Sequence, residues 1–287
     1  MRDGTVGWNP GKGNPDIIKP AGPIDPQVPV VYFRQTVNKR PLAVYVNYAV
    51  HLDNVGGDLI SADLPYTVTE SLRRAIGASL VTVYTSGSCG DLNHIDVNWS
   101  EPQKGHENAA RMGTILSGEV LKAWPQLGGV DGSLQVRRRI VQLDIPEVSA
   151  GAVENAKEIV NSGDDKSRSS FMQLVNAHKV LDVAEREGAP FEVEVQVFTL
   201  GDSLAWVALP GEIFVELGLD LKSSSPFEQT MVAELSNGSI GYVPTSRAYR
   251  QGAYEVVSAR CVKGSGERLV NAALDLLTEC YAAIKAK

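Results

Sequence analysis

The sequence alternates strand-like and helix-like segments along most of its length, and this alternation constrains the fold more than any other feature. Apolar runs rich in valine and tyrosine are typical of strands, and they occur at residues 28–36, 40–50, 79–86, 133–146, 191–211 and 229–245. Segments with helical spacing of apolar residues lie at 64–77, 103–124, 150–188, 211–225 and 266–287. This pattern predicts an α/β fold in which a mixed β-sheet is covered by helices. No internal repeat or linker interrupts residues 1–287, so we expect a single domain.

Several local features sharpen this prediction. The Gly201-Asp202 pair predicts a hairpin turn, and residues 161–165 (NSGDD) predict a turn between two helices. The segment 133–146 alternates as an edge or half-exposed strand does. Thr67 or Thr69 is a candidate N-cap of the helix at 64–77. The asparagine and glycine at 237–238 predict another turn.

The composition limits what the chain is expected to bind. It has 287 residues, of which 43% are hydrophobic and 21% charged, as is ordinary for a globular protein. The net charge of -7 argues against nucleic acid, whose binders usually carry a basic face. No apolar run is long enough to span a bilayer, which takes about 18 residues. The sequence shows no secretion signal, so as written it points to the cytoplasm, and the localisation stays open.

The three cysteines are an odd number without the spacing of a disulfide framework or a structural zinc site. Cys89 lies in a loop of glycine and serine, where it could be a reactive thiol, but a small loop-filling residue is the simpler interpretation. Cysteine chemistry therefore does not define the function.

Four polar, glycine-containing loops follow directly after apolar strands, at residues 51–63, 86–96, 210–212 and 241–254. In α/β proteins, ligands bind where strands end and loops begin. Each loop supplies groups that can bind a metal or move a proton, namely His51, His94 with Asp91, Glu212, and Tyr242 with Tyr254.

Each of these side chains also has an ordinary structural explanation. Glu212 lies between a strand and an expected helix start, where the helix N-terminus favours an ionised carboxylate. A histidine at a strand end or in a loop is often hydrogen-bonded to the backbone, and a lone tyrosine is often packed. The sequence has no HExxH, GxSxG, P-loop or GxGxxG motif. A metal site would therefore have to be assembled from distant loops, which periodicity alone cannot establish.

Five stretches, in this order and spacing, resemble one known family. They are DGTVGWNPGKGNPDIIKPAGPIDPQV (3–28), YVNYAVHLDNVGGDLISADLP (45–65), TSGSCGDLNHIDVN (85–98), ALPGEIFVELG (208–218) and SNGSIGYVPTSRAYRQGAYE (236–255). The sequence resembles the neutral/alkaline, non-lysosomal ceramidase family, in particular the catalytic N-terminal domain of its ceramidase-like bacterial branch. The resemblance covers residues 3–275.

The resemblance implies a zinc-dependent amidase that cleaves the N-acyl bond of ceramide. Matched by motif, His51, Glu212 and Tyr242 would be ligands of Zn²⁺, and Tyr254 would contact the reacting carbonyl. The family's first zinc histidine has no counterpart here, and neither has its C-terminal immunoglobulin-like domain. The chain therefore resembles the catalytic domain without its N-terminal segment.

A second departure concerns the family's GDxSPN loop, in which a serine is assigned to catalysis or substrate contact. Here the loop is GDLNHI, so Asn93 replaces the serine and His94 replaces the proline. Asn93 and His94 are candidate catalytic residues, and His94 is also a candidate substitute for the missing histidine ligand. Asp91 is a further candidate catalytic residue, and Asp91 or Asp53 would orient a ligand histidine from behind.

The expected reaction is attack of a metal-activated water on an amide or ester carbonyl of a small-molecule or lipid-like acyl substrate. Tyr254 or His94 would stabilise the oxyanion or protonate the leaving group. Two alternatives stay open. One is a promiscuous metal-dependent esterase, lactonase or phosphotriesterase that uses the same site. The other is an inactive family member that acts as a binding module or pairs with a second copy through an exposed sheet edge.

Overall fold

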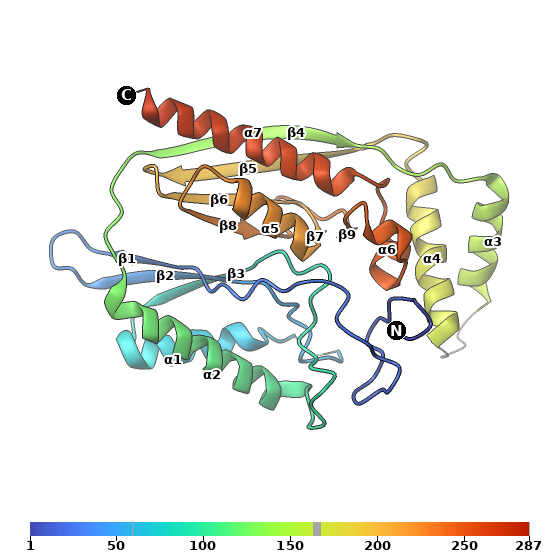
Figure 1. Cartoon of the computed structure of the whole chain (residues 1–287), viewed down its shortest axis with the longest axis horizontal. Coiled ribbons are helices and arrows are strands. Elements are labelled where there is room, and N and C mark those ends of the chain that lie inside the picture. The colour runs from blue at the N-terminus through green and yellow to red at the C-terminus, as the bar shows by residue number, and fades with distance from the viewer. Residues whose placement is uncertain (59, 163–167, 287) are drawn as a thin grey trace.

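The computed structural model describes residues 1–58, 60–162 and 168–286. It confirms the α/β class, with mixed sheets covered by helices, although the strands are divided among separate sheets. Figure 1 shows the first sheet with α1 and α2 in the lower half, and the second sheet with α5 and α7 in the upper half. None of the described helices is both long and apolar enough to cross a membrane.

The first sheet contains β1 (Val30–Arg34), β2 (Pro41–Tyr48) and β3 (Val81–Ser86). β1 and β2 are antiparallel, whereas β2 and β3 are parallel and joined through α1 (Leu64–Ile76). Val44 of β2 is buried in one cluster with Leu72 of α1 and Leu116 of α2 (Gly105–Ala123). Burying each such side chain contributes about 1.5–3 kcal/mol, so this packing fixes the end of β2 from which His51 follows.

The second sheet has the order β4 (Leu134–Leu143), β5 (Phe191–Leu200), β6 (Leu204–Ala208) and β8 (Gln229–Ala233). β4 lies at its edge, as predicted, and β5 and β6 form the predicted hairpin. α5 (Val215–Ser224) and α7 (Ser265–Lys285) cover one face, where Val195 packs in one cluster with Leu221 and Leu276.

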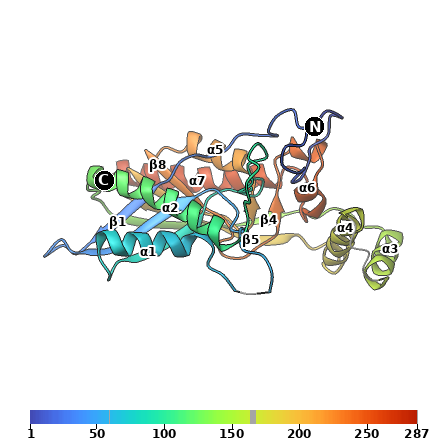
Figure 2. The same ribbon diagram turned by 90° about the horizontal axis from the view of Figure 1, so that it is seen from below.

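A pair of helices, α3 (Ala150–Asn161) and α4 (Arg168–Ala184), extends from one end of the molecule (Figure 2). This confirms two helices in the segment 150–188. The turn predicted between them falls partly at 163–165, which lie outside the described residues. Short 3₁₀ turns occur at Trp124–Gln126 and Ala248–Arg250.

The third sheet consists of two short parallel strands, β7 (Glu212–Ile213) and β9 (Tyr242–Val243), and α6 (Tyr254–Ser258) follows. The prediction that Glu212 begins a helix is therefore wrong. Pairing with β9 holds Glu212 in extended backbone, and α5 begins only at Val215.

The predicted N-cap of α1 is also wrong. Asp63, not Thr67 or Thr69, caps this helix, because its carboxylate accepts a hydrogen bond from the Leu64 backbone N–H at 2.7 Å. The helix begins at Leu64, the first residue of the segment with helical spacing, and the proline in its first turn needs no N–H partner there.

Candidate functional site

The pairing of β7 with β9 places Glu212 directly opposite Tyr242. The Glu212 N–H donates to the Gly241 carbonyl at 3.0 Å, so the two strand starts are locked side by side. Gly211 makes this approach possible, because a Cβ there would lie only 2.8 Å from the Gly241 oxygen. Two residues that are thirty positions apart thus meet at one point.

His51 joins them from the loop that follows β2. Its Nδ1 lies 2.9 Å from the Leu92 carbonyl, and its Nε2 lies 3.1 Å from Oε2 of Glu212. A carbonyl oxygen only accepts hydrogen bonds, so Nδ1 carries a hydrogen and Nε2 faces the carboxylate. A metal-bound histidine is typically oriented in this way, with its second nitrogen donating to a carbonyl or carboxylate.

The charges around His51 favour its protonated form in the absence of metal. Burial lowers the pKa of His51, but the hydrogen bond with Glu212, the charge of Glu234 and the Leu92 carbonyl together raise it to about 9. The imidazolium and the Glu212 carboxylate therefore form an ion pair. A metal ion that binds here must displace this proton, so binding would release it.

Tyr242 and Tyr254 extend this cluster. Their ring centroids lie 5.6 Å apart, and the Tyr242 ring lies 6.2 Å from the His51 ring. Tyr242 lies opposite Glu212 in the β7–β9 pair, and the Tyr254 ring meets the Tyr242 ring edge-on. Burial and the charge of Glu212 raise the pKa of both phenols, so both are neutral hydroxyls near pH 7 and can donate protons.

An aromatic surface lies against Tyr254. Trp8, from the N-terminal segment, stacks on Tyr254 with ring centroids 4.5 Å apart, and Phe171 of α4 lies 6.0 Å from the same ring. Figure 1 shows the N-terminal loop beside α6 and α4. Phe171 is 43% exposed, so the site has an apolar flank that is open to solvent.

Asp91 lies behind the cluster. Its Oδ1 accepts a hydrogen bond from the Val215 N–H at 2.7 Å, at the first residue of α5. Burial raises the pKa of Asp91 to about 6. Asp91 thus attaches the 86–96 loop to α5, and its proposed catalytic role stays a prediction.

His94 and Asn93 both contact Asp53. Nδ1 of His94 lies 2.6 Å from Asp53, and Nε2 lies 2.7 Å from the Gln103 carbonyl. Asn93 donates to Asp53 at 3.2 Å. Burial raises the pKa of Asp53, but the hydrogen bond and charge of His94 outweigh this and lower it. His94 has no ring nitrogen left for a metal in this arrangement, so its role as a substitute ligand, like the catalytic roles of both residues, stays a prediction.

Sequence reasoning did not identify one buried carboxylate near the cluster, that of Glu234 at the end of β8. It accepts hydrogen bonds from the Cys89 thiol and from the backbone N–H groups of Cys89 and Ile213. In the sequence it looks like an ordinary strand-end glutamate. Cys89 is buried and burial raises its pKa, so the thiol is neutral and the loop-filling interpretation fits.

The donors present suit a zinc ion only in part. No group of three or more His, Cys, Asp and Glu side chains within the described ranges could hold a metal. His51 and Glu212 supply a nitrogen and a carboxylate, and the Tyr242 phenol would be the third ligand. Nitrogen and oxygen ligands of this kind are used in catalytic zinc sites, which have three protein ligands and one open position. The residues fit that chemistry with a tyrosine in place of a second histidine.

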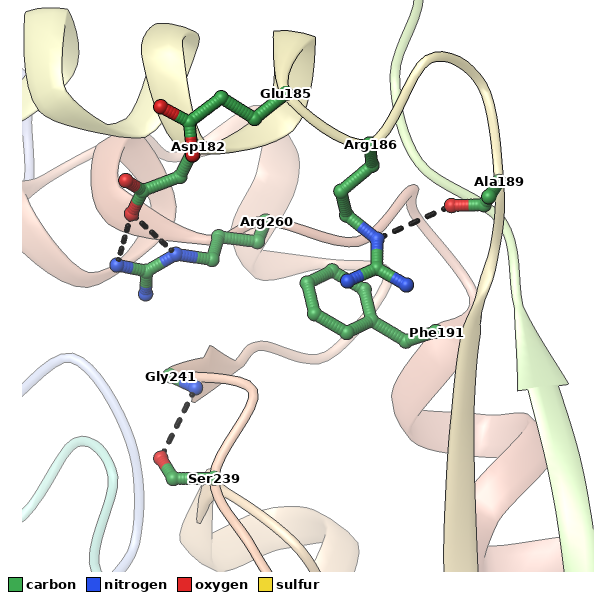
Figure 3. A pocket seen from close by; sticks show the side chains of 8 residues that line it. All are labelled: Asp182, Glu185, Arg186, Ala189, Phe191, Ser239, Gly241 and Arg260. Carbon is green, nitrogen blue, oxygen red and sulfur yellow. Dashed lines mark hydrogen bonds and ion pairs between the residues drawn. The ribbon is translucent and has the colours of Figure 1, made fainter.

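A cavity of about 650 Å³ lies near the cluster, and Figure 3 shows the residues that line it. Arg260 is held there by Asp182 through contacts of 3.0 and 2.6 Å, and the Arg186 guanidinium lies over the Phe191 ring. Gly241, which precedes Tyr242, forms part of the cavity wall. None of the predicted site residues lines the cavity. The candidate site residues therefore lie next to the cavity and are not part of its wall.

No protein-family model and no curated protein matches this sequence. Among solved structures, it is similar to the neutral ceramidase from Pseudomonas aeruginosa, with a TM-score of 0.70 and 16% identity over 91% of this chain and 47% of that one. The chain has a ceramidase-like fold. A second structure, described as a ceramidase complexed with C2, gives a TM-score of 0.67 and 16% identity over 94% of this chain and 50% of that one. This chain therefore spans about half the length of these ceramidases.

Proposed function

We propose that the protein is a zinc-dependent hydrolase that cleaves an amide (N-acyl) or ester bond. The observation that carries the proposal is the 3.1 Å approach of His51 Nε2 to the Glu212 carboxylate, with Tyr242 paired opposite Glu212 and its ring stacked beside His51. The three side chains come from segments separated by up to 191 positions in the sequence: His51 follows the end of β2, and Glu212 and Tyr242 begin the paired strands β7 and β9. The ceramidase-like fold supports the same conclusion.

His51, Glu212 and Tyr242 would hold the metal. When bound there, Zn²⁺ supplies Lewis acidity and lowers the pKa of a water molecule toward about 7. The Leu92 carbonyl fixes the His51 ring so that Nε2 is directed at the site. The Tyr254 hydroxyl, kept neutral by burial and by the charge of Glu212, would donate a hydrogen bond to the oxyanion or a proton to the leaving group.

The substrate we propose is lipid-like and carries an acyl chain. Both ceramidase structures suggest such a substrate, and the aromatic flank formed by Trp8, Phe171 and Tyr254 offers apolar surface next to the reacting groups. The exposure of this flank also favours a second candidate, hydrolysis of small activated esters, lactones or phosphotriesters at the same site.

Metal analysis and a substrate panel test the proposal. Purified full-length protein is dialysed against Zn²⁺, its zinc content is measured, and a short-chain fluorescent ceramide is assayed beside p-nitrophenyl esters, a lactone and a phosphotriester. Glu212→Gln should abolish both zinc binding and hydrolysis. The control Glu194→Gln, which changes a surface glutamate paired with Arg138, should leave both unchanged. Zinc-free, inactive wild-type protein of full stability would instead support a binding module.

A further inference from the structure

Glu234 is a buried carboxylate that no side-chain cation pairs with among the described residues. It is 7% exposed. Its Oε2 accepts from the Cys89 N–H at 3.1 Å and from the Ile213 N–H at 2.9 Å, and its Oε1 accepts from the Cys89 thiol at 2.8 Å. Burying a carboxylate is costly unless it is well hydrogen-bonded, and here one side chain satisfies two backbone donors at once.

The two backbone groups belong to the two segments that carry the proposed site. Ile213 directly follows Glu212 in β7. Cys89 begins the turn that contains Leu92, since the Leu92 N–H donates to the Cys89 carbonyl at 2.9 Å. The Leu92 carbonyl in turn accepts from Nδ1 of His51. One hydrogen-bond partner of Glu234 is therefore the residue next to Glu212. The other lies in the same turn as Leu92, whose carbonyl orients His51.

The turn at residues 89–92 and strand β7 also contact each other directly, and their backbones are too close for a side chain to lie between them. The Gly90 N–H donates to the Ile213 carbonyl at 2.8 Å, and a Cβ at Gly90 would collide with the Glu212 carbonyl. Without the Glu234 carboxylate, the N–H groups of Cys89 and Ile213 would be buried without a partner, which is unfavourable. Separation of the two segments would relieve that cost and move Glu212 away from His51.

We propose that Glu234 is a positioning residue for the metal site. Through the N–H groups of Ile213 and Cys89, it holds Glu212 and the Leu92 carbonyl in the relative position that lets His51 and Glu212 share one cation. This inference rests on the proposed function for the identity of the ion. The positioning itself concerns the chain alone and can be measured without metal.

Three variants of the full chain separate the role of the hydrogen bonds from that of the charge. Glu234→Gln keeps an oxygen for both N–H groups and an amide that can donate to the Cys89 sulfur. Glu234→Asp keeps the charge but is one methylene too short to reach both N–H groups. Glu234→Ala removes every contact. Apparent Zn²⁺ affinity is measured by competition with a chromophoric chelator.

We expect Glu234→Gln to bind zinc within about threefold of the wild type, and Glu234→Ala and Glu234→Asp to lose about 10- to 100-fold, the usual effect of removing a residue that orients a metal ligand. Val195→Ala, a core change in β5, is the control for lost stability and should keep the wild-type affinity. If Glu234→Asp keeps the wild-type affinity, or if Val195→Ala loses as much affinity as the Glu234 variants, the proposal is overturned.

A second readout does not depend on zinc. Long-range ¹H–¹⁵N spectra of the metal-free protein report the hydrogen on Nδ1 of His51. The Nδ1 resonance should be retained in Glu234→Gln and shifted in Glu234→Asp, because the Leu92 carbonyl moves. Absence of zinc binding by the wild type would refute the proposed function, whereas identical His51 resonances in the wild type and Glu234→Asp would refute the positioning role.

Discussion

Replacing Glu234 by glutamine should make the metal-free protein more stable, and increasingly so as the pH rises. Burial raises the pKa of Glu234 from 4.5 to about 7, and the hydrogen bonds from Cys89 and Ile213 lower it only in part. The unfolded chain releases this proton near pH 4.5, whereas the folded chain keeps it until about pH 7. Between these values the folded state binds more protons, so the wild type loses stability as the pH rises.

The size of the effect follows from that interval. Each pH unit between the two pKa values is worth about 1.4 kcal/mol, so the wild type should lose up to about 3 kcal/mol relative to Glu234→Gln by pH 7.5. Glutamine keeps acceptors for both N–H groups, so its own contribution does not vary with pH.

Urea unfolding with a chelator present, followed by circular dichroism at pH 5, 6, 7 and 8, measures this difference. Titrating groups that Glu234 does not influence cancel in the comparison, whereas His51, whose pKa the charge of Glu234 raises, does not cancel and is followed separately by its imidazole resonances. The stability advantage of Glu234→Gln should grow from pH 5 to pH 7 and then level off. An advantage that is the same at every pH, or that shrinks as the pH rises, would refute the assignment of a buried, proton-retaining carboxylate.

Three further predictions concern the site and its surroundings. Tyr254→Phe should lower kcat for ester and amide substrates by about 10²-fold with KM nearly unchanged, because only the hydroxyl that serves the transition state is lost; an unchanged kcat would contradict this. Trp8→Ala should raise KM for long-chain acyl esters several-fold but leave short-chain esters unaffected, and equal effects on both chain lengths would show that Trp8 does not contact the acyl chain. Asp91→Ala should lower the free energy of unfolding by about 0.5–2 kcal/mol through loss of the hydrogen bond to Val215 at the start of α5; the control Asp58→Ala changes an exposed loop carboxylate and should lower it by less.

The layered α/β organisation could be predicted from the sequence because its elements are long and periodic. The edge strand β4, the β5–β6 hairpin and the long helix α2 each span enough residues for the apolar pattern to show. The alternation of strands with polar loops also identified His51, Glu212 and Tyr242 as candidates. Their meeting point could not be found in the same way, since β7 and β9 have only two residues each and no periodicity.

The same limitation explains why the sequence pattern assigns Glu212 to a helix and why the contacts of His94 and Glu234 could not be predicted. Glu212 stands three residues before α5, so a pattern that ignores pairing with β9 assigns it to the helix. His94 is a candidate ligand because loop position and residue type favour it, and this role stays a prediction; its contacts with Asp53 and the Gln103 carbonyl could not be read from the sequence. Glu234 carries no local signal at all, because its partners at 89 and 213 are far away in the sequence. Tertiary contacts decide all three cases.

The most direct test of the account is a crystal structure of the full chain grown with excess Zn²⁺, with the ion located by anomalous scattering at the zinc edge. We expect one ion bonded to Nε2 of His51 at about 2.0–2.1 Å and to a Glu212 oxygen at about 2.0–2.2 Å, with the Tyr242 hydroxyl as a further ligand. A structure in which zinc is absent or bound elsewhere, with the His51–Glu212 contact intact, would contradict the central claim that these three side chains form a metal site.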